Sequence, residues 1–307
     1  MNISVVIPVF NGRELLKRYF PSVVAACREY SIKKTELIVV DDASADGSGD
    51  YVRAEFPFVR IIRSESNKGF SGAANSGIFA ARNRIVVLFN DDIEATGNFF
   101  AAIPRHFEYP AVFAVRAGLK GESGTDTAGP RIGGRFRLGS FAAPLAARPS
   151  LQYAFFAGGG AAAYDKDKFM ELGGFDELFS PFYWEDVDLS YRAWKRGWKV
   201  VYEPGSVVYH QGGATINKFY NRAYIASIAE RNKYFLVWKN VSDIWLLFQH
   251  MVLTPVRIAG SVLKGNLAPF TGFIRALKHL KTVLIKRRAE KRFWKAGDRE
   301  IFGLFRN

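Results

Sequence analysis

The amino-acid sequence predicts an α/β protein whose sheet is mostly parallel and flanked by helices. Two observations favour this class. Short apolar runs alternate with helical patterns over the first ninety residues, and polar motifs stand where the apolar runs end, as they do at ligand-binding sheet edges. The 307 residues are 49% apolar and 23% charged, which excludes wholesale disorder, collagen and a multispan membrane protein.

The first half of the chain has the clearest pattern. Four runs have the apolar composition of strands buried in a sheet: residues 4–9, 36–40, 59–63 and 84–89. A helical pattern occupies 14–30, and residues 43–49 form a small polar turn. Residues 70–82 are rich in Ala and Gly, which suits a helix packed tightly on the sheet.

The second half has a weaker pattern. Residues 116–150 are rich in Gly, Arg and Pro. This composition predicts a long loop or irregular hairpin over the ligand-binding edge of the sheet. Beyond them, helices are expected at 166–172 and 185–196, and strands near 199–202 and 207–210. From Asn217 a helical pattern continues to the end, broken near Pro255 and at Pro269.

The net charge of +14 is divided unevenly. Residues 215–307 hold 18 basic and 5 acidic groups, whereas residues 1–214 hold 25 and 24. A nearly neutral body therefore carries a basic tail, which favours polyanions such as nucleic acid, an anionic membrane surface or a phosphate-rich substrate. Cys27 is the only cysteine, which fits a reducing cytoplasm, and the start of the chain shows no signal-peptide pattern.

Acidic residues end two predicted strands. In the pair Asp41-Asp42, one carboxylate suits a hydrogen bond from a nucleotide base or ribose, although such residues are equally typical of helix N-caps. In Asn90-Asp91-Asp92, closely spaced oxygens suit a divalent cation held against a diphosphate, although Asn and Asp also favour turns. Lys68 precedes the Ala-rich helix and suits either a phosphate contact or a solvated turn.

A second group of candidates lies in the later half. Asp186 opens the 185–196 helix and suits a general base whose pKa the preceding aromatic residues raise. Acidic residues there are also favoured by the helix dipole alone. His210 ends a predicted strand and is a metal ligand, a proton donor or a structural histidine. The glycines at 158–160 indicate backbone that approaches a ligand or helix closely.

In their order, these motifs resemble the inverting family-2 glycosyltransferases, whose GT-A fold is a Rossmann-like, mostly parallel sheet flanked by helices. The resemblance covers roughly residues 1–240, and the bacterial rhamnosyltransferase-like enzymes of surface polysaccharide assembly are the nearest subgroup in appearance. The segments that carry it are Ser4-Val5-Val6-Ile7-Pro8-Val9-Phe10-Asn11, Leu37-Ile38-Val39-Val40-Asp41-Asp42-Ala43-Ser44, Asn67-Lys68-Gly69-Phe70, Ala74-Asn75-Ser76-Gly77, Leu88-Phe89-Asn90-Asp91-Asp92, Gly173-Gly174-Phe175-Asp176-Glu177, Trp184-Glu185-Asp186-Val187-Asp188-Leu189 and Val208-Tyr209-His210.

The resemblance implies roles for the matching residues. Asp186 would be the catalytic base. Asp92 would bind Mg²⁺ or Mn²⁺ with the help of His210. The acceptor would contact Trp184 and Glu185. The donor, a nucleoside-diphosphate sugar of UDP or dTDP type, would contact Pro8, Val9, Phe10, Asn11, Asp41, Asp42, Lys68, Gly69, Asn75, Asn90, Asp91, Gly159 and Gly160.

One position departs from the family pattern. Asn90 stands where the family has the first aspartate of its DxD motif. An amide oxygen is neutral, so the metal site loses one negative charge and we expect the cation to be held more weakly.

The resemblance also implies an organisation. Residues 1–215 would form the GT-A catalytic domain, with a nucleotide-sugar half up to about 115 and an acceptor half from 116. Residues 216–307 would form a basic helical extension. In it, residues 241–263 are largely apolar but interrupted by polar residues, which predicts a poor membrane-spanning helix or a core helix. Residues 270–295 carry nine basic residues interleaved with apolar ones, as in a helix on an anionic membrane surface or a solvated charged face.

The function that follows is hexosyl transfer, of rhamnose or another sugar, to a hydroxyl of a glycan or lipid-linked acceptor by metal-assisted single displacement. We expect a peripheral enzyme on the cytoplasmic face of the plasma membrane and no nucleic-acid partner. Two other classes stay open. A nucleic-acid-binding protein explains the basic tail but not the acidic strand ends, and a catalytically silent scaffold also stays open. A sugar nucleotidyltransferase would carry a Gly-rich basic loop after its first strand, where this chain is short and poor in glycine.

Overall fold

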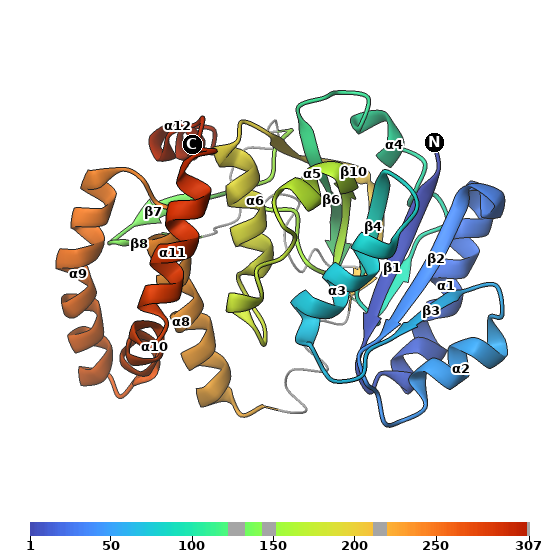
Figure 1. Ribbon diagram of the computed structural model, residues 1–307, viewed down its shortest axis with the longest axis horizontal. Coiled ribbons are helices and arrows are strands. Elements are labelled where there is room, and N and C mark those ends of the chain that lie inside the picture. Colours follow the sequence, from blue (N-terminus) through green and yellow to red (C-terminus); the bar gives the residue numbers. More distant parts are fainter. Residues whose placement is uncertain (122–132, 143–151, 211–219, 306–307) are drawn as a thin grey trace.

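The computed structural model describes residues 1–121, 133–142, 152–210 and 220–305. Its centre is one sheet of eight strands in the order β3-β2-β1-β4-β9-β6-β10-β5 (Figure 1). The strands are β1 Ile3–Val9, β2 Thr35–Asp41, β3 Arg60–Arg63, β4 Ile85–Phe89, β5 Ile93–Ala95, β6 Val112–Lys120, β9 Ala161–Asp165 and β10 Lys199–His210. Strands β3, β2, β1 and β4 run parallel, β9 is antiparallel to both of its neighbours, and β10 is parallel to β6.

Helices cover both faces of the sheet because the inner strands are buried on both sides. The helices of this body are α1 Arg13–Ser31, α2 Ser48–Glu55, α3 Gly69–Ala80, α4 Ile103–His106, α5 Lys166–Glu171 and α6 Glu185–Lys195. Alternation along β1 sends Val5 and Ile7 into a cluster with α1, and Val6 into a second cluster with α3 and α6.

Close packing explains the small residues of α3. A Cβ atom on Gly77 would lie 2.4 Å from a methyl carbon of Val6 and 2.8 Å from one of Val40. Only glycine therefore lets the helix approach β1 and β2 this closely. The tight packing predicted for residues 70–82 is confirmed.

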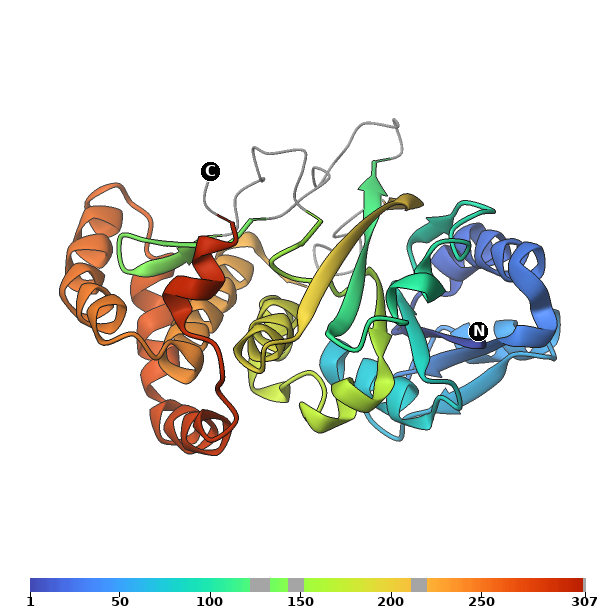
Figure 2. The same ribbon diagram turned by 90° about the horizontal axis from the view of Figure 1, so that it is seen from above.

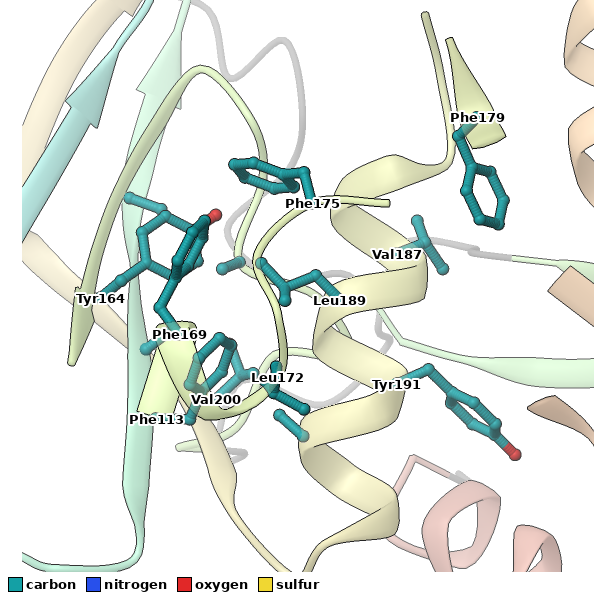
Figure 3. Close-up of a cluster of buried hydrophobic side chains, with 14 of the residues drawn as sticks. Phe113, Tyr164, Phe169, Leu172, Phe175, Phe179, Val187, Leu189, Tyr191 and Val200 are labelled. Atoms are coloured by element: carbon teal, nitrogen blue, oxygen red, sulfur yellow. The ribbon is translucent and has the colours of Figure 1, made fainter. Parts of the chain in front are cut away.

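Helix α6 is buried from two sides. Figure 3 shows Leu189 on the side of the strands, near Phe175, and Tyr191 pointing the other way, toward the C-terminal helices. Those helices are α8 Arg222–Asn240, α9 Ile244–Leu263, α10 Ala268–Leu277, α11 Leu280–Lys291 and α12 Asp298–Gly303. Phe235 of α8 and Phe302 of α12 share one hydrophobic cluster with α6 and the sheet. The described part of the predicted extension thus shares a core with the sheet.

Several predicted elements need correction. Strands near 199–202 and 207–210 are one strand, β10, whose pairing with β6 shifts register between Glu203 and Val207. Residues 116–120 of the predicted loop belong to β6, so the expected boundary between halves at 115/116 falls inside a strand. A short hairpin is present, formed by β7 Arg135–Arg137 and β8 Ser140–Ala142. Residues 122–132 and 143–150 of that segment lie outside the described residues.

The C-terminal predictions also need correction. Helix α9 continues through Pro255, whereas Pro269 does lie at the start of a new helix, α10. Helix α9 is not a core helix, since only His250 and Thr254 of it are buried. By length and composition it is the one described helix that could cross a membrane, with a mean hydropathy of 1.3. Residues 217–219 and the expected domain boundary at 215/216 lie outside the described residues.

Candidate active site

The loops after β1 and β2 are fastened to each other at one sheet edge. Asn11 has a positive φ of 51°, and its backbone N–H donates to the Ser44 hydroxyl at 3.0 Å. The Asn11 side chain in turn accepts from the Ala45 N–H at 2.8 Å. Pro8 and Val9, in β1, are buried. The expected donor residues of the first strand therefore form a fixed edge rather than a free loop.

Asp41 and Asp42 are both buried and both hold backbone. The Asp42 carboxylate accepts from the N–H groups of Lys68, at 3.0 Å, and Gly69, at 2.9 Å, and so caps helix α3. Asp41 accepts from the Ser44 N–H at 2.8 Å. The capping alternative is thus what these contacts show, on α3 rather than on α2. The Lys68 side chain is exposed at the same edge.

A hollow of about 360 Å³ opens beside these residues, at the ends of β2 and β3. It is lined by Ala43, Arg63, Ser64 and Glu65. Ala43 has a positive φ of 62°, which turns the chain away directly after Asp42. The hollow combines one cation, Arg63, and one anion, Glu65, with hydrogen-bonding groups, a combination that suits a nucleotide base or ribose.

Asp92 and His210 come together from distant parts of the chain. His210 lies opposite Ile93 in the β10–β5 pairing, and its Nε2 atom lies 3.1 Å from the Asp92 Oδ1 atom. Both atoms are buried and, apart from each other, neither has a polar partner among the described residues. Two ligands at right angles on one Mg²⁺ or Mn²⁺ ion lie about 3.0 Å apart, given bonds of about 2.1 Å. An oxygen and a neutral imidazole nitrogen at this spacing fit such an ion.

The described residues hold no cluster of three His, Cys, Asp or Glu side chains suited to a metal. Any cation would therefore take its other ligands from the donor diphosphate and water. Asp91 stands beside this pair, and burial and the Asp92 charge raise its pKa to about 7. A cation bound there would favour the ionised form of Asp91.

Asp186 lies in the first turn of α6 with both carboxylate oxygens engaged. One oxygen accepts from the Gly159 N–H at 3.1 Å and the other from the Val187 N–H at 2.8 Å. Burial raises the pKa of Asp186, while these N–H groups and the charge of Arg116 lower it, leaving it above the ordinary carboxyl value. Burial and the Asp186 charge raise the pKa of the neighbouring Glu185 well above the ordinary carboxyl value, so the two carboxyl groups compete for a proton.

The glycine segment joins the two acidic motifs. Gly159 contacts Asp186, and the next residue, Gly160, accepts a hydrogen bond from the Asn90 N–H at 3.0 Å. A Cβ atom on Gly160 would lie 2.9 Å from the Asn90 side chain. The close approach predicted for residues 158–160 is confirmed, and it brings Asn90 near Asp186 although the two lie far apart in the sequence.

Three supporting residues emerge that the sequence did not reveal in these roles. Arg116, buried in β6, donates to the Ala157 carbonyl at 3.2 Å and acts electrostatically on Asp186. Asn75, expected at the donor, makes two hydrogen bonds to the Phe175 backbone, at 2.8 and 2.9 Å. Both therefore position backbone around the site. An arginine inside the apolar run 112–118 was the available signal for Arg116.

The third is Asn232, in helix α8. Its amide lies 2.7–3.0 Å from three carbonyl oxygens, those of Phe179, Phe182 and Tyr183. Tyr183 and Trp184 have positive φ angles of 70° and 75°, which non-glycine residues rarely adopt. Asn232 thus holds the strained turn that delivers Glu185 and Asp186.

The sequence was compared with protein-family models and with curated proteins. A family model described as Glycosyl transferase family 2 matches residues 4–173. Over 215 residues the chain is 27% identical to pre-mycofactocin glycosyltransferase of Mycobacterium tuberculosis, which covers 68% of this chain and 42% of that protein. Over 114 residues it is 35% identical to undecaprenyl-phosphate 4-deoxy-4-formamido-L-arabinose transferase of Pectobacterium carotovorum, covering 36% of this chain and 34% of that protein. The chain thus spans less than half the length of these curated relatives.

The fold also matches solved glycosyltransferase structures. Mannosyltransferase PcManGT from Pyrobaculum calidifontis, in complex with GDP-Man and Mn²⁺, superposes with a TM-score of 0.58 at 16% identity. The match covers 95% of this chain and 87% of that protein. The sheet order and its flanking helices are therefore of the GT-A type.

Proposed function

The chain belongs to glycosyl transferase family 2, and we propose that it moves a hexosyl group, rhamnose or a related sugar, from a nucleoside-diphosphate sugar to a hydroxyl group during cell-surface polysaccharide synthesis. The observation that carries the proposal is the joining of two acidic motifs through Gly159 and Gly160. One motif supplies a proton acceptor, Asp186, and the other supplies Asp92, a ligand for a divalent cation.

The chemistry proposed for Asp186 is general base catalysis. Its carboxylate takes the proton of the acceptor hydroxyl while that oxygen attacks the anomeric carbon. The bond from that carbon to the diphosphate breaks with its electron pair, so one displacement inverts the anomeric centre and no protein nucleophile is needed. Because burial raises the pKa of Asp186, it binds a proton more strongly than an ordinary carboxylate. The Gly159 N–H fixes its direction.

The donor would bind across the sheet edge. Its base and ribose would occupy the hollow beside Arg63 and Ser64, and its diphosphate would face Asp92, His210 and the exposed Lys68. Asp92 and His210 would hold Mg²⁺ or Mn²⁺, which when bound supplies charge neutralisation for the departing diphosphate. The ammonium group of Lys68 would add to that stabilisation. A UDP or dTDP donor is our expectation.

The acceptor side is proposed from the aromatic turn and from one relative. Trp184 and Glu185 would line the acceptor, beside Asp186. A relative of this chain is named for undecaprenyl phosphate, which supports a lipid-linked acceptor here. The basic C-terminal helices would then hold the enzyme at the cytoplasmic face of the plasma membrane.

The test is thermal stability of the purified chain with UDP, dTDP and GDP, each with and without Mg²⁺ or Mn²⁺. A nucleotide at 100 times its Kd stabilises the folded state by about 2.7 kcal/mol. We expect one nucleotide to raise the melting temperature in a metal-dependent way.

Asp92→Ala should abolish the metal-dependent part, while the control Asp50→Ala, at an exposed ion pair on α2, should keep it. A flat response of the wild-type chain to all three nucleotides would contradict the proposal.

A further inference from the structure

Helix α9 presents a largely exposed apolar face, and Trp245 at its edge also lines a hollow with Phe136 and Phe302. Six large side chains on this face are 47–84% exposed: Ile244, Trp245, Phe248, Met251, Val252 and Val256. They recur at intervals of three or four residues along much of the helix, so they line one face. Only 11% of the most apolar 18-residue stretch of α9 is buried inside the protein. Figures 1 and 2 both show α9 at the outer end of the molecule, away from the sheet.

The opposite face of α9 is fastened to the protein. His250 accepts a hydrogen bond from the Trp238 indole N–H at 2.9 Å and donates from Nδ1 to the Gly139 carbonyl at 2.5 Å. These bonds tie α9 to α8 and to the β7–β8 hairpin. A helix crossing a bilayer would have to break them and leave buried polar groups unpaired. The helix is therefore built to lie along a surface with one face outward.

The charge of the surrounding segment indicates which kind of surface the apolar face of α9 binds. Between residues 244 and 297 the chain has eleven Lys or Arg residues and one acidic residue, Glu290. Lys264, which follows α9, and Arg275 and Lys278, in and just after α10, are exposed. A second copy of the chain would bring like charges together, whereas an anionic lipid surface would attract them. An apolar helix face within a strongly basic segment is typical of helices that lie in the headgroup region of a bilayer.

We propose that the outer face of α9 inserts into the interface of an anionic lipid bilayer, with the helix parallel to the membrane plane. This deepens the membrane part of the proposed function, because it names an apolar anchor where the sequence indicated only electrostatic attraction by residues 270–295. It does not depend on the catalytic chemistry, since no residue of the active site lies on α9.

The experiment is sedimentation of the full chain with vesicles of phosphatidylcholine containing phosphatidylglycerol. Phe248→Glu and Met251→Glu should each weaken binding about tenfold or more, because each removes a buried apolar side chain and adds a repelled charge. The matched controls are Phe58→Glu and Met170→Glu, on other surfaces. Their side chains are each 49% exposed, against 47% for Phe248 and 66% for Met251, and they should bind as wild type does.

Binding in high salt and tryptophan fluorescence distinguish insertion of apolar side chains from purely electrostatic attraction to the vesicles. In about 1 M salt, where charges are screened within about 3 Å, part of the wild-type binding should persist. Vesicles should also shift tryptophan emission to the blue, and Trp245→Phe should remove most of that shift.

Three results would overturn the proposal: wild-type binding by both α9 variants, complete release by salt, or a lipid-free dimer that Phe248→Glu dissociates. Nucleotide-dependent thermal stabilisation of the same variants reports on the catalytic body, so failure of the proposed function would be recognised separately.

Discussion

At the scale of single residues, the proposed base is controlled by a buried cation. Arg116 lies in β6, beneath the glycine segment, and a Cβ atom on Gly158 would come within 2.9 Å of its Nη1 atom. Its charge lowers the pKa of Asp186 against the effect of burial. Since the proposed base must be ionised before it can accept a proton, Arg116 would extend its working range to lower pH, together with the N–H groups of Val187 and Gly159.

Replacing this cation gives a pH-dependent prediction. In Arg116→Gln the pKa of Asp186 should rise, so the acidic limb of kcat/KM against pH moves to higher pH. Each unit of movement lowers activity on that limb tenfold. Arg116→Lys, which keeps the charge, should stay nearer to wild type. An unchanged limb in Arg116→Gln would show that Asp186 is not the titrating base.

Residues differ in how far the sequence could predict them. Asp186, Asp92 and His210 could be proposed from the sequence because residue type and position at the ends of predicted elements suggest their chemistry. The hydrogen bonds of Asp42 and Asn75 were not, since their partners lie far along the chain, at Gly69 and Phe175. Which backbone groups a polar side chain satisfies depends on tertiary contacts that no local pattern contains.

At the scale of elements, helix α8 acts as a brace for the catalytic turn. Besides Asn232, its Lys239 binds Asp188 at 2.9 Å, and Asn240 donates to Asp188 at 2.7 Å. Asp188 lies two residues after Asp186 and fixes α6 to α8. A helix outside the matched family segment therefore helps to position α6 and the proposed base, Asp186.

The brace can be tested through the rate. Asn232→Ala removes the donor that holds the strained turn at Tyr183, so kcat should fall about tenfold to a hundredfold because the base is displaced. Nucleotide-dependent stabilisation should remain, since the donor edge is separate. The control Asn221→Ala removes the N-cap of the same helix, costs about 1 kcal/mol of stability and should leave kcat nearly unchanged. An equal fall of kcat in Asn232→Ala and Asn221→Ala would indicate general destabilisation of the protein instead.

Elements were predictable where one local signal dominated. The apolar strands β1, β2 and β4 and the helices α1 and α3 were found because burial on both faces and helical periodicity are visible in sequence. Strand β9 was missed because its Ala161-Ala162-Ala163 has little strand preference and pairs only through tertiary contacts with β4 and β6. Pro255 did not end α9. A proline removes one backbone hydrogen bond of a helix, and at this exposed position water can take its place.

At the scale of the whole molecule, the C-terminal helices are part of the folded core. Asp298 of α12 forms an ion pair with Lys195 of α6 at 2.6 Å, and both side chains are fully buried. The same carboxylate accepts from the Ser242 N–H. Deleting residues 270–307, the simplest test of the basic tail, would therefore also open the core, so point variants are the better probe.

The Asp298–Lys195 pair gives a stability prediction. Among the described residues, Asp298→Ala removes the only carboxylate paired with buried Lys195 and leaves it with the Ser242 hydroxyl alone, so the free energy of unfolding should fall by about 3–5 kcal/mol. Burial raises the pKa of Asp298, but Lys195 lowers it further, so its stabilisation is present above the ordinary carboxyl pKa and is lost in acid. The difference in the free energy of unfolding between variant and wild type should become smaller as the pH falls below about 4.

Urea unfolding at several pH values measures this difference. Glu14→Ala, which breaks an exposed ion pair with Lys17, is the control and should cost less than about 1 kcal/mol. A loss of that small size in Asp298→Ala would mean that Lys195 finds another partner.

The glycine segment at 158–160 also sets a rule for exchanging parts between family members. The family match ends at residue 173, yet the segment inside it fits against Asp186 and Glu185 outside it. A chimera that imports a new donor specificity by replacing residues 4–173 would inherit a glycine segment shaped for a foreign α6. Such recombinants should recover turnover only when the crossover is moved so that both sides of this contact come from the same parent.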